Sequence, residues 1–189
     1  MIQVYTGNGK GKTTAAIGLA IRALGAEHKV FFMQFMKSLA YSEQHILQKM
    51  PNLTLETTGK PFFIAEEGMM DERAQETLGS DVVIFPKGHP PDDYVALLTS
   101  GLDRVMDVIS KGVTNLIILD EINIALSFGL LRREQMEEIL HVLPSETELI
   151  CTGRNAPQWL LDRADLITEM REVRHYYERG ISARKGIEN

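Results

Sequence analysis

Short runs of apolar residues alternate with longer amphipathic stretches along the chain. Apolar runs cover residues 2–6, 29–36, 53–57, 115–121, 148–153 and 165–170, and helical patterns cover roughly 12–26, 41–50, 65–78, 92–111, 132–142 and 157–164. Strands with consecutive apolar positions are buried on both faces, which is typical of a parallel sheet covered by helices. The pattern predicts a three-layer α/β fold of the P-loop NTPase type, recombinase-like, with a mostly parallel sheet of about six strands.

Two regions fit this alternation less well. Residues 58–64 and 80–91 mix glycine and proline with apolar side chains, so both are predicted to be loops, the second with an additional short strand as an alternative. No repeat or linker divides the chain. At 189 residues it is long enough for one sizeable core, and we predict a single domain over residues 1–189.

Charge and cysteine content narrow the class of protein. The net charge of -6 argues against the overall basic surface on which nucleic-acid binding usually depends. No nucleic-acid partner is therefore expected. The one cysteine, Cys151, lies in an apolar run and is expected to be a buried thiol. No apolar run has membrane-spanning length, so no membrane association is expected. Together these features predict a cytoplasmic protein.

The first apolar run leads into the glycine-rich stretch TGNGKGKTT at 6–14 and then into an alanine-rich helical pattern. A strand, GxxxxGK[ST] and a helix form the phosphate-binding loop (P-loop) of nucleoside triphosphatases, with Thr6 here in place of the first glycine. Backbone NH groups and the helix N-terminus attract phosphate in such a loop. We therefore predict a triphosphate site, in which Lys12 contacts the terminal phosphates and Thr13 binds Mg²⁺.

A second motif supports the nucleotide site. The apolar run at 115–121 ends in Asp120 and Glu121, which is the acidic motif that holds the metal ion in P-loop proteins. A helix-capping role for this pair is the alternative. The two motifs leave the reaction open: Glu121 could orient a water for hydrolysis, and an ATPase, a nucleotide-dependent switch and a recombinase-like DNA motor all remain, the last disfavoured by the acidic composition.

Several segments together resemble, in order and spacing, the P-loop type of ATP:corrinoid (cob(I)alamin) adenosyltransferases. They are YTGNGKGKTTAAIGLAIRALG, FMQFMKS, IILDEINIAL, CTGRNAPQWLLDRADLITEM and VRHYYERGISARKGIE. The resemblance spans nearly the whole chain except about residues 60–95. It implies transfer of the 5'-deoxyadenosyl group of ATP to the Co(I) centre of a corrinoid, with release of triphosphate, in adenosylcobalamin biosynthesis or salvage. Such a reaction needs alignment and a neutralised leaving group more than proton transfer.

The resemblance also implies roles for residues by position. The expected ATP contacts are Gly7, Asn8, Gly9, Lys10, Gly11, Lys12, Thr13, Thr14, Lys37 and Arg154. The expected catalytic residues are Lys12, Thr13 and Glu121, and the expected Mg²⁺ ligands are Thr13, Asp120 and Glu121.

The family carries corrin-bordering aromatic residues after its third strand, where this chain has Phe62 and Phe63. The resemblance therefore implies a corrinoid contact for Phe62 or Phe63, and packing in the buried core is the alternative for these rings. ATP and a reduced corrinoid are the implied substrates, with a reductase as electron donor and a homodimeric state. A P-loop ATPase or nucleotide-dependent switch without corrinoid activity is the alternative function.

Overall fold

A computed structural model of the chain describes residues 1–38, 41–69, 82–181 and 183–188. Within these residues, a six-stranded sheet has the order β3-β2-β6-β7-β1-β8, and every neighbouring pair of strands is parallel. Its strands are β1 (Ile2–Thr6), β2 (Val30–Phe35), β3 (Leu53–Thr58), β6 (Leu116–Asp120), β7 (Glu148–Thr152) and β8 (Leu166–Glu169). Each lies within one residue of a predicted apolar run, so the predicted sheet is confirmed.

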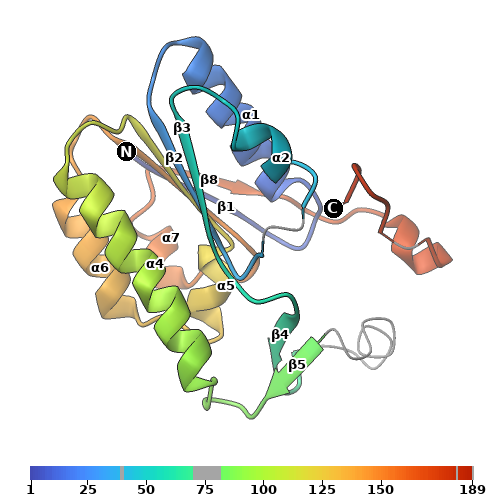
Figure 1. The fold of residues 1–189 in the computed structure, drawn as a ribbon. Helices are drawn as coiled ribbons and strands as arrows, with labels where there is room; N and C mark the ends of the chain where they lie inside the picture. The colour runs from blue at the N-terminus through green and yellow to red at the C-terminus, as the bar shows by residue number, and fades with distance from the viewer. Residues whose placement is uncertain (39–40, 70–81, 182, 189) are drawn as a thin grey trace.

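Helices cover both faces of this sheet, which gives the predicted three layers (Figure 1). One face carries α1 (Lys12–Gly25), and the other carries α4 (Asp92–Ser110) and α6 (Arg133–Val142). Shorter helical segments are α2 (Gln44–Leu47), α5 (Ile122–Ser127), α7 (Gln158–Leu161) and the 3₁₀ turn η2 (Tyr176–Arg179). Among the described residues, no helix combines the length and apolar character needed to cross a bilayer.

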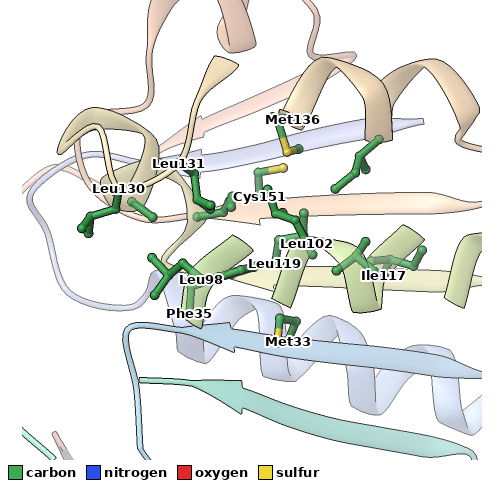
Figure 2. Close-up of a cluster of buried hydrophobic side chains, with 14 of the residues drawn as sticks. Met33, Phe35, Leu98, Leu102, Ile117, Leu119, Leu130, Leu131, Met136 and Cys151 are labelled. Carbon is green, nitrogen blue, oxygen red and sulfur yellow. The ribbon is translucent and has the colours of Figure 1, made fainter. Parts of the chain in front are cut away.

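Alternate side chains of β2 enter the two halves of the core. Phe32 packs with Ala16 and Ala20 of α1, whose small side chains let that helix approach the sheet closely. Met33 and Phe35 point to the opposite face, where Leu98 and Leu102 of α4 lie (Figure 2). Burial on both faces explains why the strand is apolar at nearly every position.

The segment between β3 and α4 departs from prediction. A helix was predicted over 65–78, but β4 (Phe63–Glu66) is a strand that pairs in parallel with β5 (Val82–Phe85) in a second, two-stranded sheet. The helix prediction is therefore wrong at 65–69, and residues 70–78 lie outside the described residues. Burial of Ile64 and Ala65 outweighs local helix propensity there. The additional strand within 80–91 is confirmed, whereas the predicted loop at 58–64 already contains the start of β4.

Candidate active site

The carboxyl ends of β1, β6 and β7 meet at one edge of the sheet, and the P-loop follows the first of them. Gly7 and Gly11 have φ angles of 91° and 116°, which side-chain-bearing residues rarely adopt. The loop leads into α1 at Lys12, and no side chain caps this helix end. The amide groups at the helix N-terminus are thus available to an anion, as the motif predicts.

Lys12 folds back over its own loop. Its ammonium group donates to the carbonyl oxygens of Gly7 at 2.6 Å and Gly9 at 2.8 Å. Burial lowers the pKa of Lys12, although the carboxylates of Glu121 and Asp120 oppose that effect. The charge is therefore held where the loop curves, close to the position at which terminal phosphates are expected.

Asp120 is the centre of the hydrogen-bond network at this edge. Its side chain is fully buried and accepts from both threonines at Oδ1: Thr13 Oγ1 at 2.9 Å and Thr152 Oγ1 at 2.6 Å. At Oδ2 it accepts from Lys37 Nζ at 2.8 Å and Gln34 Nε2 at 3.1 Å. The structure therefore brings Thr13, Lys37 and Asp120 together, as the sequence predicted for the first and last of them.

The pKa values of the neighbouring acids Asp120 and Glu121 are shifted in opposite directions. Burial alone would raise the pKa of Asp120, but the Lys37 ammonium and the hydrogen bonds hold that pKa below its ordinary value. Burial and the adjacent Asp120 charge raise the pKa of Glu121. Glu121 also has a left-handed backbone with φ of 62°, and its NH donates to Thr152 Oγ1 at 3.1 Å. The Thr152 hydroxyl thus fixes both acids, one through its carboxylate and one through its backbone.

These residues fit a magnesium ion. The Thr13 hydroxyl and the Asp120 carboxylate are hard oxygen donors, and the Lys37 ammonium lies 3.4 Å from Thr13 Oγ1 as well as against Asp120. This position therefore already accommodates a positive charge. Magnesium in proteins prefers a small number of carboxylate and hydroxyl ligands and completes its shell with water and phosphate oxygens.

Arg154 and Lys37 approach the loop from different strands. Arg154 follows β7 and is exposed, and its charge acts on both Lys12 and Glu121. Lys37 follows β2 and is largely enclosed, with its ammonium 5.2 Å from the centre of the Tyr41 ring. Both predicted residues therefore lie at the edge of the sheet that carries the P-loop. Lys37 also contacts Asp120 of the acidic motif.

The end of β8 packs directly against the P-loop. The Gly9 NH donates to the Met170 carbonyl at 2.7 Å, and the Met170 NH donates to the Thr6 carbonyl at 2.8 Å. Farther along, Lys10 Nζ donates to the Ile187 carbonyl at 2.8 Å and lies 3.5 Å from the Glu188 carboxylate. One predicted phosphate contact, Lys10, is thus engaged with the C-terminal segment in this structure.

The aromatic pair after β3 is divided between core and surface. Phe62 packs on Tyr94 of α4 with ring centres 6.1 Å apart, whereas Phe63 is 49% exposed. Gly59 brings this segment against Lys37, because an added Cβ would lie 2.4 Å from the Lys37 backbone nitrogen. The segment carrying the two rings is therefore attached to the same β2 end that supplies Lys37.

Gln34 and Thr152 are absent from the predicted site, yet both hydrogen-bond to Asp120. Gln34 interrupts the apolar run VFFMQFM, and a polar residue inside a doubly covered strand is a signal that it has a polar partner. Thr152 ends the apolar run of β7. Neither partner can be deduced from the sequence, because β6 becomes the neighbour of both strands only in the folded sheet.

Comparison with known proteins matches this chain over its full length. The family described as ATP:corrinoid adenosyltransferase BtuR/CobO/CobP matches residues 1–189. The chain belongs to the ATP:corrinoid adenosyltransferase family. The expected resemblance is thereby confirmed, and the family match also spans residues 60–95, which that resemblance did not cover.

Individual relatives agree with the family match. The corrinoid adenosyltransferase of Escherichia coli (strain K12) is 30% identical, with 100% of this chain and 85% of that protein covered. That of Pseudomonas aeruginosa is 29% identical, with 100% and 83% covered. Among solved structures, the crystal structure of the KaiC-like protein PH0186 from Pyrococcus horikoshii OT3 aligns with a TM-score of 0.40 at 16% identity, covering 89% of this chain and 71% of that one.

Family membership makes the chain an enzyme of the transferase class, an ATP:corrinoid adenosyltransferase of cobalamin biosynthesis. ATP and a corrinoid are accordingly its substrates. The alternative of an ATPase or switch without corrinoid activity is not favoured.

Proposed function

We propose that the P-loop holds the triphosphate of ATP as a leaving group while the 5'-deoxyadenosyl group passes to the cobalt of a reduced corrinoid. The observation that carries this assignment is the 2.9 Å contact between Thr13 and Asp120 beside an uncapped helix end. It occurs in a chain that matches the adenosyltransferase family from residue 1 to residue 189.

In the proposed step the Co(I) nucleophile forms a bond to C5' of ATP, the C5'–O bond breaks, and its electron pair leaves with the triphosphate. Loop NH groups and the Lys12 ammonium stabilise the developing negative charge. When bound, Mg²⁺ supplies further neutralisation of the triphosphate. Thr13, Asp120 and Glu121 would hold that ion.

The hydrogen bonds of Asp120 support charge stabilisation over proton transfer. Both carboxylate oxygens already accept two donors each, from Thr13 and Thr152 on one side and from Lys37 and Gln34 on the other. A carboxylate with a lowered pKa is a poor general base at neutral pH. Attack by Co(I) requires no base, so this arrangement suits the transfer.

Together with Lys12, the cationic side chains of Lys37 and Arg154 are proposed to surround the triphosphate. Lys37 approaches through Asp120 and Thr13, and Arg154 lies close enough to Lys12 to lower that residue's pKa. Together with Lys12 they place cationic groups from three strand ends around one loop. The high negative charge of the triphosphate leaving group would be stabilised by this arrangement.

On the corrinoid side, we assign the contact to Phe63 more than to Phe62. Phe63 is half exposed, whereas Phe62 is engaged with Tyr94. An exposed ring can lie against the flat corrin, and its segment is held near the nucleotide edge by the close approach of Gly59 to Lys37.

Three further features belong to this proposal. Because the reaction consumes Co(I), an electron donor such as a reductase would supply the reduced corrinoid. A homodimer and a cytoplasmic location follow the expectation drawn from the sequence. Size-exclusion chromatography with light scattering tests the first of these two, and cell fractionation tests the second.

The decisive experiment incubates the protein anaerobically with ATP, Mg²⁺ and chemically reduced cobalamin. The corrin spectrum should change to that of adenosylcobalamin, and triphosphate should appear in equal amount. Orthophosphate release with an unchanged corrin spectrum would overturn the proposal.

Two variants separate the parts of the proposed site. Lys12→Ala should abolish adenosyl transfer, whereas Phe63→Ala should slow it while leaving the KM for ATP unchanged. Val113→Ala is the matched control, because Val113 is also exposed and apolar but precedes β6 at the opposite edge of the sheet. Equal rates for Phe63→Ala and the control would remove the corrinoid role of Phe63.

A further inference from the structure

Gln34 lies near the carboxyl end of β2 and is fully buried, and its side-chain amide links Asp120 to the segment after β2. Its Nε2 donates to Asp120 Oδ2 at 3.1 Å, and its Oε1 accepts from Gln44 Nε2 at 2.7 Å. Gln44 begins α2 and is only 2% exposed. A continuous hydrogen-bonded path therefore runs from the acidic motif to the segment that follows β2.

Gln44 makes two further hydrogen bonds, both to the backbone of the segment that follows β2. The same Nε2 donates to the Ser38 carbonyl at 2.9 Å, and the Tyr41 NH donates to Gln44 Oε1 at 3.1 Å. Both contacts are to backbone groups, so they restrain the path of the chain and do not depend on surface side chains. Ser38 directly follows Lys37, whose ammonium shares Asp120 Oδ2 with Gln34.

The direction of both amides is set by Asp120. A carboxylate only accepts, so Gln34 must present its NH₂ group to it and its oxygen to the other side. That oxygen in turn requires the NH₂ group of Gln44. Buried amides without partners are costly, so each glutamine keeps the other in one orientation.

We propose that Gln34 and Gln44 are positioning residues that fix the Asp120 carboxylate and the Lys37 segment in one arrangement for the magnesium complex of ATP. This inference rests on the proposed role of Asp120 in holding Mg²⁺. Thr13 and Thr152 restrain Oδ1, and the glutamine pair with Lys37 restrains Oδ2. The carboxylate is thereby held against rotation on both sides, and the second restraint extends to α2.

The test replaces each glutamine by methionine, which is similar in length but offers neither amide group. Binding of ATP is measured by calorimetry with excess Mg²⁺ and again with EDTA. Gln34→Met and Gln44→Met should each weaken binding of the magnesium complex by on the order of 10-fold, as expected for groups that orient a metal ligand, and leave metal-free ATP binding unchanged.

The double variant tests whether the two residues act through one another. A shared path predicts that Gln34→Met/Gln44→Met loses no more affinity than the weaker-binding single variant. The proposal would be overturned if the fold-losses of affinity in the two single variants multiplied in the double variant. It would also be overturned if ATP binding were weakened equally in Mg²⁺ and in EDTA. If Gln34→Met does not fold, Gln44→Met alone still decides, because unchanged Mg²⁺-dependent binding in that variant would also overturn it.

Thr147→Val is the matched structural control. Thr147 is 3% exposed, and its hydroxyl donates to the Thr114 carbonyl at 3.1 Å before the start of β7. This variant loses one buried hydrogen bond at the opposite edge of the sheet and should keep the Mg²⁺ dependence of the wild type. Failure of the wild type to adenosylate cobalamin would reject the proposed function separately, since the present readout is nucleotide binding alone.

Discussion

The Lys37 ammonium lies 2.8 Å from Oδ2 of Asp120, and this ion pair joins the ends of the adjacent strands β2 and β6. The carboxylate is fully buried, and the lysine side chain is 12% exposed. An ion pair so enclosed contributes little net stability, but removal of one partner leaves an uncompensated charge in a medium of low polarity. The pair is therefore a sensitive point of the fold as well as of the site.

Lys37→Met should lower the free energy of unfolding by about 3 kcal/mol at pH 7, the range found for breaking a buried pair. Adding Asp120→Asn should restore part of that loss, because the remaining charge is removed as well. Urea unfolding followed by circular dichroism measures both. A double variant that is less stable than Lys37→Met would contradict the idea that an unpaired charge is the cause.

The same pair predicts a pH dependence. The folded-state pKa of Asp120 lies below its ordinary value, so its stabilising contribution is present above about pH 4 and is lost as the pH falls further. In Lys37→Met the ammonium no longer lowers that pKa, whereas burial still raises it against the Thr13 and Thr152 hydrogen bonds. The gain in stability as the pH rises through about 4 should therefore be smaller in the variant than in the wild type, as measured by urea unfolding at a series of pH values.

Glu121→Gln should stabilise the nucleotide-free protein at neutral pH. Burial and the Asp120 charge raise the folded-state pKa of Glu121, so stability falls as the pH rises from the ordinary value of 4.5 toward that raised pKa. The advantage of the variant should be absent below about pH 4.5 and grow as the pH rises, in a series of urea unfolding curves. The same variant should bind the magnesium complex of ATP more weakly. A constant difference at all pH values would exclude titration of Glu121 as the cause.

Cys151 should report global unfolding. Its side chain is fully buried in the central sheet, and burial raises the pKa of the thiol to about 12. The reactive thiolate is therefore almost absent at pH 8. Labelling by iodoacetamide should be slow in buffer and should follow the urea unfolding curve. Rapid labelling of the folded protein would show that β7 opens locally.

The strands and the P-loop were predictable because their signals are local. Continuous apolar runs predicted the bounds of each strand of the six-stranded sheet to within one residue, and the GKT sequence after the first run predicted the loop that joins β1 to α1. Met170 and Gln44 could not be placed in the same way. The contact of Met170 with Gly9 depends on β8 becoming the neighbour of β1, and sequence patterns do not determine strand order. The contact of Gln44 with Gln34 depends on where α2 packs after β2, which the local pattern does not show either.

In the β4–β5 region, by contrast, a clear local pattern predicted the wrong element. Residues 65–69 carry a helical pattern, yet Ile64 and Ala65 are buried within a strand that pairs with residues far along the chain. Long-range burial outweighs local preference most easily in short segments, where propensity differences sum to little. For the same reason the short helix α5, directly after Glu121, was not predicted.

Gly9→Ala should impair the P-loop far more than its small size suggests. An added Cβ would lie 2.7 Å from the Met170 carbonyl oxygen, which also accepts the Gly9 NH, so either the loop or the end of β8 must move. We expect loss of ATP binding in calorimetry, together with destabilisation of more than about 1 kcal/mol, as is usual when a side chain is forced against backbone.

Gly18→Ala is the matched control within α1. No atom outside the neighbouring helix backbone lies within 4 Å of its added Cβ, and the exchange should stabilise that helix by roughly 0.5–1 kcal/mol with ATP binding retained. Normal ATP affinity in Gly9→Ala would show that the contact with Met170 is not needed for the phosphate-binding conformation.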